Sequence, residues 1–161
     1  NKNSMSKKIK YLCTFLLLVL ATSCGFKKFN QNENSFYIQD IIVTGENRSA
    51  YTLKNEIRIA SDKNSKKIYN MKINIIKKKN TKIKDETGKT IRYTVDMTAN
   101  VYLENINGQK ITNKSFFRNG DYDVVALHSD TVRNEKHTTK KIIENLSEDI
   151  ITFIGFHKIT R

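Results

Sequence analysis

The sequence predicts an α+β domain in which two helices pack on one face of a four-stranded, mainly antiparallel sheet. Two observations predict it. Residues 90–104 alternate between apolar and polar side chains, which is the pattern of a strand in a sheet with one wet face. Apolar residues recur at helical spacing in two other segments, one before and one after this strand. The resulting order is strand, helix, three strands, helix, and both helices can cover the apolar face of one sheet.

The first strand and the first helix come from the region after residue 35. Residues 36–44 are β-branched and aromatic and end at Gly45, which predicts a largely buried strand. Asn47 is then placed to cap a helix. Residues 48–62 carry an apolar stripe at helical spacing, which predicts that helix, and the stripe consists of Ala50, Leu53, Ile57 and Ala60.

The middle of the chain predicts a meander of three strands. Residues 67–76 alternate, and the apolar side chains on one face are Tyr69, Met71, Ile73 and Ile75. A lysine-rich loop over residues 77–89, with a weak turn signal at Thr87–Gly88, is expected to lead into residues 90–104. Asn107–Gly108 predicts a type I′ hairpin turn, and residues 109–119 return as the last strand.

The last third of the chain predicts a helix. Ser129 or Asp130 is placed to start it, and Gly155 to cap its end. Its apolar stripe is intermittent and consists of Val132, Thr139, Ile142, Ile143, Leu146, Ile150, Phe153 and Ile154. We expect residues 36–161 to form a single domain.

The N-terminus has the pattern of an export signal. Lys7, Lys8 and Lys10 precede a continuous apolar run over residues 11–21. A helix of that length rises roughly 16 Å, short of the ~30 Å hydrocarbon core of a membrane, so the run suits a signal peptide and not a transmembrane span. We expect residues 1–23 to be a removable signal peptide, with translation starting at Met5.

Small residues precede Cys24 directly after the apolar run, in the order Leu-Ala-Thr-Ser-Cys-Gly. This resembles a bacterial lipobox, in which Cys24 would carry the lipid anchor and residues 24–35 would form a tether. The resemblance implies attachment to the outer membrane, because Gly25 stands where lipoproteins kept at the inner membrane tend to have Asp. The alternative is an ordinary secreted protein with Cys24 as a free thiol. Signal removal leaves Cys24 as the only cysteine, which excludes an internal disulfide.

Motifs for catalysis or metal binding are missing from the sequence. His128, His137 and His157 have no spacing typical of a metal site and read as surface or cap residues. Asp121 and Asp123 read as a loop or helix-start pair. Because no nucleophile motif or phosphate-binding loop occurs either, we expect no enzyme, no metal and no cofactor.

The charge is strongly basic, with 29 Lys and Arg against 16 Asp and Glu and a net charge of +13. The composition is rich in Lys, Ile and Asn and lacks Pro, so either an AT-rich coding alphabet or an anionic partner explains the charge. One cluster of cations lies between two predicted strands. It is either a solvated loop or a patch for anions such as lipid A phosphates, and it contains Lys77, Lys78, Lys79, Lys82, Lys84 and Lys89, with Arg92 beside them. We expect no nucleic-acid ligand, because the chain is expected to be exported.

The opening Cys24-Gly25-Phe26 resembles the LPS-assembly lipoprotein family LptE (RlpB), whose mature chains often begin Cys-Gly-Phe and then a residue and Pro-Leu. This chain has Lys28-Phe29 in place of Pro-Leu. The order of predicted elements over residues 36–154 also agrees with that family.

The resemblance implies a lipid-anchored outer-membrane protein that sits in the lumen of the β-barrel LptD, supports and plugs it, and binds lipopolysaccharide. It implies no catalysis and no cofactor. The basic cluster would then be the candidate lipopolysaccharide site. A free-standing periplasm-facing ligand-binding lipoprotein, or an accessory subunit of barrel assembly, is the alternative.

Overall fold

The computed structural model describes residues 35–157. Its elements follow in the order β1 (Tyr37–Gly45), α2 (Asn47–Ala60), β2 (Ile68–Lys84), β3 (Thr90–Glu104), β4 (Lys110–Asp123) and α3 (His128–Phe156). The predicted α+β class and the predicted element order are confirmed. The expected signal peptide, Cys24 and nearly all of the expected tether lie outside the described residues.

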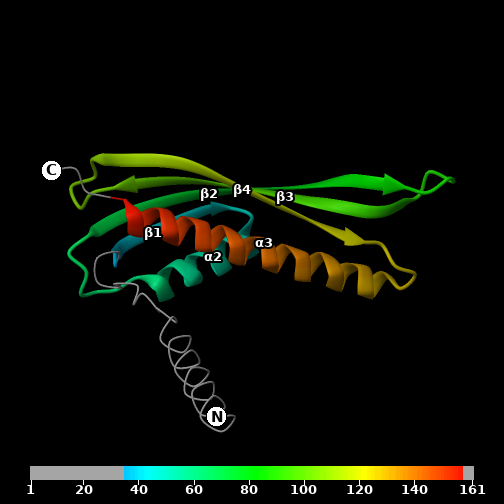
Figure 1. The fold of residues 1–161 in the computed structure, drawn as a ribbon, viewed down its shortest axis with the longest axis horizontal. Coiled ribbons are helices and arrows are strands. Elements are labelled where there is room, and N and C mark those ends of the chain that lie inside the picture. Colours follow the sequence, from blue (N-terminus) through cyan, green and yellow to red (C-terminus); the bar gives the residue numbers. More distant parts are fainter. Residues whose placement is uncertain (1–34, 158–161) are drawn as a thin grey trace, which may run out of the picture. The chain divides into compact units, whose positions relative to one another are not determined.

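The four strands form one sheet in the order β1-β2-β3-β4. Strand β1 runs parallel to β2, which is possible because α2 carries the chain back between them, and the other two pairs are antiparallel. Helices α2 and α3 lie on the same face of this sheet (Figure 1). The sheet therefore has one face covered by helices and one open face, as the alternation of residues 90–104 predicts.

The core lies between the sheet and the two helices. Strand β3 contributes the most deeply buried row, which is at most 1% exposed and consists of Val95, Met97, Ala99, Val101 and Leu103. The predicted apolar row of β2, from Tyr69 to Ile75, is buried against the same layer. The helices close the core with Ala50, Leu53, Ile57, Ile142, Ile143, Leu146, Ile150 and Ile154. The predicted helical stripes are therefore largely confirmed.

Several predicted ends and caps are wrong. Glu46, not Asn47, caps α2, because its carboxylate accepts a hydrogen bond from the Ser49 amide at 2.6 Å. Helix α3 starts at His128 without a side-chain cap, and Gly155 is a buried residue inside the helix, which ends at Phe156. Strand β1 is less buried than expected because it is an edge strand with one covered face.

The largest difference from the sequence prediction concerns the lysine-rich segment. It is not a loop, because β2 continues to Lys84 and pairs with β3 along most of its length, with Lys79 opposite Val95 and Lys84 opposite Thr90. Strand β4 likewise runs to Asp123 and not to residue 119. Isoleucine and threonine are interspersed with the lysines and favour a strand, and the register with β3 supplies backbone hydrogen bonds. The ends of β2 and β3 reach beyond the helix layer (Figure 1).

The two hairpin turns have one geometry. Asp85 and Asn105 each use Oδ1 to accept hydrogen bonds from the amides two and four residues later, at 2.9 to 3.0 Å. Gly88 and Gly108 follow three residues after them and take positive φ values of 85° and 77°. Asn107 has no positive φ, so the predicted type I′ turn is wrong.

Candidate functional site

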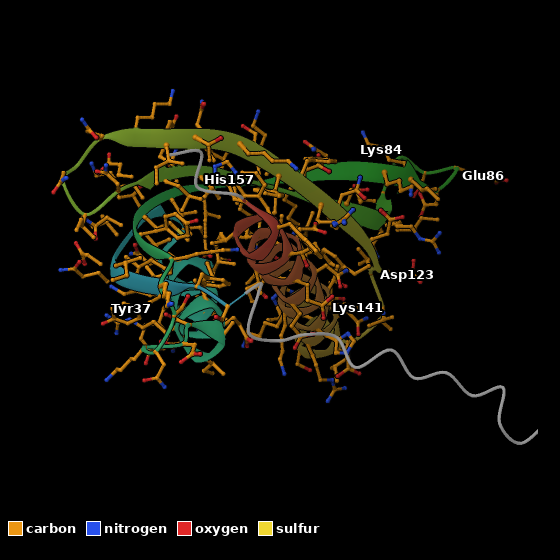
Figure 2. All side chains as sticks on the ribbon, turned by 60° about the vertical axis from the view of Figure 1, so that its left-hand side comes forward. Tyr37, Lys84, Glu86, Asp123, Lys141 and His157 are labelled. Atoms are coloured by element: carbon orange, nitrogen blue, oxygen red, sulfur yellow. The ribbon has the colours of Figure 1, made fainter. Side chains whose placement is uncertain are left out.

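The seven candidate cations do not form one patch. Alternation along β2 places Lys77 and Lys79 on the face that the helices cover. Three others lie on the open face of the sheet, namely Lys78, Lys82 and Arg92. Lys84 and Lys89 flank the turn at the end of the hairpin, and Figure 2 shows Lys84 beside Glu86 there, far from Tyr37.

Glu135 of α3 neutralises the two lysines on the covered face. Its carboxylate lies 2.8 Å from Lys79 Nζ and 3.5 Å from Lys77 Nζ, and it also accepts a hydrogen bond of 2.8 Å from the Tyr122 hydroxyl. Partial burial alone would raise the pKa of Glu135, but the hydrogen bonds from Lys79 and Tyr122 outweigh it and hold the pKa below its ordinary value. Glu135 therefore connects α3 to β2 and β4 through its salt bridges and its hydrogen bond.

Two tyrosine rings complete the surroundings of Lys79. Its Nζ lies 4.4 Å from the ring centre of Tyr93 and 5.3 Å from that of Tyr122, and the two rings stack 5.6 Å apart. The hydrogen bond to Glu135, followed by the one to Tyr122, raises the pKa of Lys79. Lys79 is thus a positively charged structural residue, and an incoming anion would have to compete with Glu135 for it.

Carboxylates of β4 pair with two cations on the open face. Lys82 pairs with Asp121, and Arg92 pairs with Asp123. Hydrogen bonds from Lys82 and then Thr94 hold the pKa of Asp121 below its ordinary value. Asp121 and Asp123 are strand residues in ion pairs, so the expectation of a loop or helix-start pair is wrong.

Three of the seven cations remain open to a ligand. Lys78, Lys84 and Lys89 make no side-chain salt bridge with any residue in the range 35–157. Lys78 and Lys84 lie on the hairpin strand, and Lys89 follows the turn. The described part of the chain thus reduces the candidate anion site to one lysine on the open face and two lysines at the turn of a projecting hairpin.

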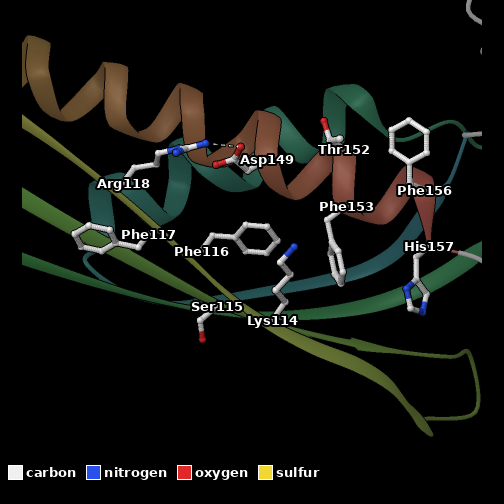
Figure 3. Close-up of a pocket in the computed structure, with 10 residues that line it drawn as sticks. All are labelled: Lys114, Ser115, Phe116, Phe117, Arg118, Asp149, Thr152, Phe153, Phe156 and His157. Atoms are coloured by element: carbon white, nitrogen blue, oxygen red, sulfur yellow. Dashed lines mark hydrogen bonds and ion pairs between the residues drawn. The ribbon is translucent and has the colours of Figure 1, made fainter.

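A groove that the sequence reasoning missed lies between edge strand β4 and the C-terminal half of α3. It has a volume of about 680 Å³. Phe116 and Phe153 meet edge-on with their ring centres 5.6 Å apart, and Lys114 Nζ lies about 5 Å from both rings (Figure 3). Arg118 and Asp149 form an ion pair of 2.8 Å at one end. An apolar group next to a negative charge suits this groove.

The sequence contained a signal for the hairpin tip and a weaker one for the aromatic groove. The pattern Asp-x-x-Gly at Asp85 matches Asn-x-x-Gly at Asn105, and it could have located the hairpin tip. The groove had a weaker signal, the adjacent Phe116 and Phe117 in an alternating strand. The partnership of Glu135 with two lysines had none, because it joins residues far apart in the sequence.

Metal-binding side chains do not cluster within the described range, where no group of three His, Cys, Asp or Glu could hold an ion. His128 starts α3, His137 is exposed on the same helix, and His157 follows its last residue. Among the described helices, none combines the length and the apolar character needed to cross a membrane.

The sequence matches no protein-family model and no curated protein. Solved structures do share the fold. A minor lipoprotein from Acinetobacter baumannii is 12% identical at a TM-score of 0.56, over 74% of this chain and 91% of that one. Rare lipoprotein B from Shewanella oneidensis is 8% identical at a TM-score of 0.53, over 71% and 92%. Lipoprotein B from Nitrosomonas europaea is 13% identical at a TM-score of 0.56, over 81% and 90%. At these identities the similarity establishes the fold.

Proposed function

We propose that this chain is an outer-membrane lipoprotein subunit of the lipopolysaccharide export and assembly machinery. It supports and plugs the LptD β-barrel from the periplasmic side or from within the barrel lumen, and it binds lipopolysaccharide. Cys24 carries the lipid anchor. The role requires recognition and packing, and no catalytic group, metal or cofactor.

The agreement between a sequence motif and the fold carries this proposal. A lipobox-like segment opening on Cys24-Gly25-Phe26 precedes a domain whose fold is shared with rare lipoprotein B, and rare lipoprotein B is the second name of the LptE family. The sequence motif and the fold are independent of each other, since the motif lies outside the residues that determine the fold.

The lipopolysaccharide contact, in this proposal, uses the unpaired lysines of the hairpin. Lys78, Lys84 and Lys89 offer ammonium groups to phosphates without breaking an ion pair. Lys82 and Arg92 contribute only where phosphate replaces Asp121 or Asp123. Lys77 and Lys79 contribute least, because Glu135 and the tyrosine rings hold them in the folded domain.

Partner identity is the first test. The tagged full chain is extracted from its native membrane in mild detergent, and the proteins that co-purify are identified. We expect one large β-barrel in stoichiometric amount. A chain that purifies alone would favour the free-standing ligand-binding lipoprotein, and co-purification with barrel-assembly subunits would favour the accessory role.

Lipopolysaccharide binding is the second test. Replacing Lys78, Lys84 and Lys89 by Ser should weaken binding at low salt, and the difference should shrink in 1 M salt because the Debye length falls from about 10 Å at 0.1 M to about 3 Å. The matched control replaces three exposed lysines away from the hairpin tip, Lys63, Lys66 and Lys110. Equal weakening in both triple variants would attribute binding to net charge and reject the hairpin site.

A further inference from the structure

A second concave site lies on the helix side of the domain, away from the aromatic groove. It is a cleft of about 450 Å³ between the first turns of α2 and the first half of α3, and Lys77 of β2 also lines it. Proteins hold small organic ligands in cavities of roughly this size. The cleft therefore has room for a small molecule.

Four basic side chains contribute to the lining of the cleft, and Lys77 is one of them. Arg48 enters from α2, and Lys136 and Lys140 enter from α3. Among the described residues, Arg48 and Lys136 form no salt bridge, and Lys140 has only a loose one of 3.6 Å to Glu144. The positive charge of these three side chains is thus available to a ligand.

Both carboxylates in the lining are already engaged. Glu46 caps α2 and accepts a hydrogen bond from the Ser49 amide. Glu135 accepts hydrogen bonds from Lys79 Nζ and the Tyr122 hydroxyl. Neither carboxylate neutralises the side chains of Arg48 or Lys136. An anionic ligand would therefore meet a net attraction in the cleft.

One hydroxyl group in the lining lacks a hydrogen-bond partner. Ser49 is buried, and the Glu46 carboxylate engages both its backbone amide and its side chain. Thr139 Oγ1, across the cleft on α3, is buried and unpaired. A buried hydroxyl without a partner costs about 1–3 kcal/mol. Rotation about its Cα–Cβ bond would let the Thr139 hydroxyl donate to an acceptor placed in the cleft, so it favours an acceptor-rich ligand.

We propose that this cleft binds a soluble phosphate monoester with a short alkyl body. The cationic donors come from both helices, and their number suits the three terminal oxygens of a tetrahedral phosphate better than the two oxygens of a planar carboxylate. Val132 and the buried Ile143 give the wall an apolar part for the alkyl body. None of the three hairpin lysines proposed for lipopolysaccharide lines this cleft, so the proposal does not rest on the proposed role in lipopolysaccharide export.

The test measures binding by calorimetry with the full chain in a non-ionic detergent, using hexyl phosphate, inorganic phosphate, hexanoate and dihexanoyl phosphatidic acid. We expect hexyl phosphate to bind most tightly, because inorganic phosphate lacks the apolar contact, hexanoate lacks the third oxygen, and two acyl chains overfill the cleft. Equal or tighter binding of the phosphatidic acid would identify a lipid ligand and overturn the soluble ester. Hexanoate equal to hexyl phosphate would overturn the phosphate.

Variants locate the site. The double variant Lys136→Gln with Lys140→Gln should weaken hexyl phosphate binding about tenfold. Lys141→Gln removes one positive charge from an exposed neighbour on α3 that does not line the cleft, and should leave affinity within about twofold. Thr139→Val, which keeps the shape and removes the hydroxyl, should weaken binding about fivefold. Thermal unfolding confirms that each variant is folded. Equal effects of the Lys141 variant and the double variant would reject the cleft.

Discussion

Lys79 of β2 donates a hydrogen bond of 2.8 Å to Glu135 of α3, and this contact fastens the base of the projecting hairpin to the helix layer. The same carboxylate accepts a hydrogen bond from the Tyr122 hydroxyl of β4. One side chain thus joins two strands and a helix at the point where the apolar core ends. The hairpin beyond this point depends on its own backbone ladder and on surface ion pairs.

Removing the charge of Glu135 should therefore destabilise the domain. Glu135→Gln keeps the size of the side chain but removes the carboxylate that forms salt bridges with Lys77 and Lys79, and we expect a loss of about 1 kcal/mol in the free energy of unfolding. Urea denaturation followed by circular dichroism measures it. Glu86→Gln at the exposed hairpin turn is the matched control and should change stability little. Equal losses in the two variants would show that the contact contributes nothing specific.

The contribution of this contact should depend on pH at both ends of the scale. The pKa of Glu135 is lowered in the folded state, so its stabilisation is present above its ordinary value of 4.5 and is lost as the pH falls toward the lowered pKa. The pKa of Lys79 is raised, so its part is present below 10.5 and is lost as the pH rises above that value. The difference in stability between the parent and Glu135→Gln should be constant between these limits and shrink outside them.

The facing of β3 can be tested with neighbouring residues. Val95 is 0% exposed against the helices, so Val95→Asp places a carboxylate in the core and should cost several kcal/mol. Asp96 lies on the open face, where it accepts a hydrogen bond of 2.7 Å from Asn80, so Asp96→Val should cost about 1 kcal/mol or less. Thermal unfolding of both variants measures the two losses of stability. A smaller loss of stability for Val95→Asp than for Asp96→Val would contradict the assignment of the buried face of β3.

Two glycines with positive φ should respond differently to alanine. A Cβ on Gly45 would lie 1.9 Å from the carbonyl oxygen of Ile75, a contact that the backbone can relieve only by moving, so Gly45→Ala should cost about 3 kcal/mol. Gly88 has a similar φ but nothing within 4 Å of such a Cβ, so Gly88→Ala should cost only about 1 kcal/mol. Denaturant midpoints of the two variants compare the two costs, and equal midpoints would attribute both to backbone strain alone.

The proposed lipid anchor is tested by Cys24→Ser. We expect the variant to lose acylation and remain unprocessed or leave the membrane fraction, because the acyl chains supply the membrane affinity. Incorporation of radiolabelled palmitate, together with membrane fractionation, measures this. The parent chain is the positive control, and equal labelling of the variant would reject Cys24 as the attachment site.

The sequence was sufficient to predict the fold class because its periodic segments are long. The alternation of residues 90–104 determines which face of β3 is buried, and the stripe from Ile142 to Ile154 does the same for α3. Both are local patterns that tertiary packing reinforces. The prediction was wrong where two local preferences competed, as at Asn107, where the turn uses the side chain of Asn105 and not a positive φ at Asn107.

The candidate site could be predicted only as a set of residues. Lysines read as loop residues because they are charged, yet the length of β2 depends on its pairing with β3, which is a non-local property. Their division between two faces follows from that pairing. Their partners Glu135, Asp121 and Asp123 are distant in the sequence, so the number of unpaired cations follows only from the folded chain.

The parallel position of β1 has a consequence for the order of folding. Strands β2, β3 and β4 are joined by tight turns, so their pairing needs only local chain closure. The partner of β1 comes after the whole of α2, so β1 can dock only once β2 exists. During N-to-C synthesis, β1 therefore emerges early and is incorporated late. Until then the edge of β2 and part of the core are uncovered, and this is the stage at which the chain is most open to aggregation.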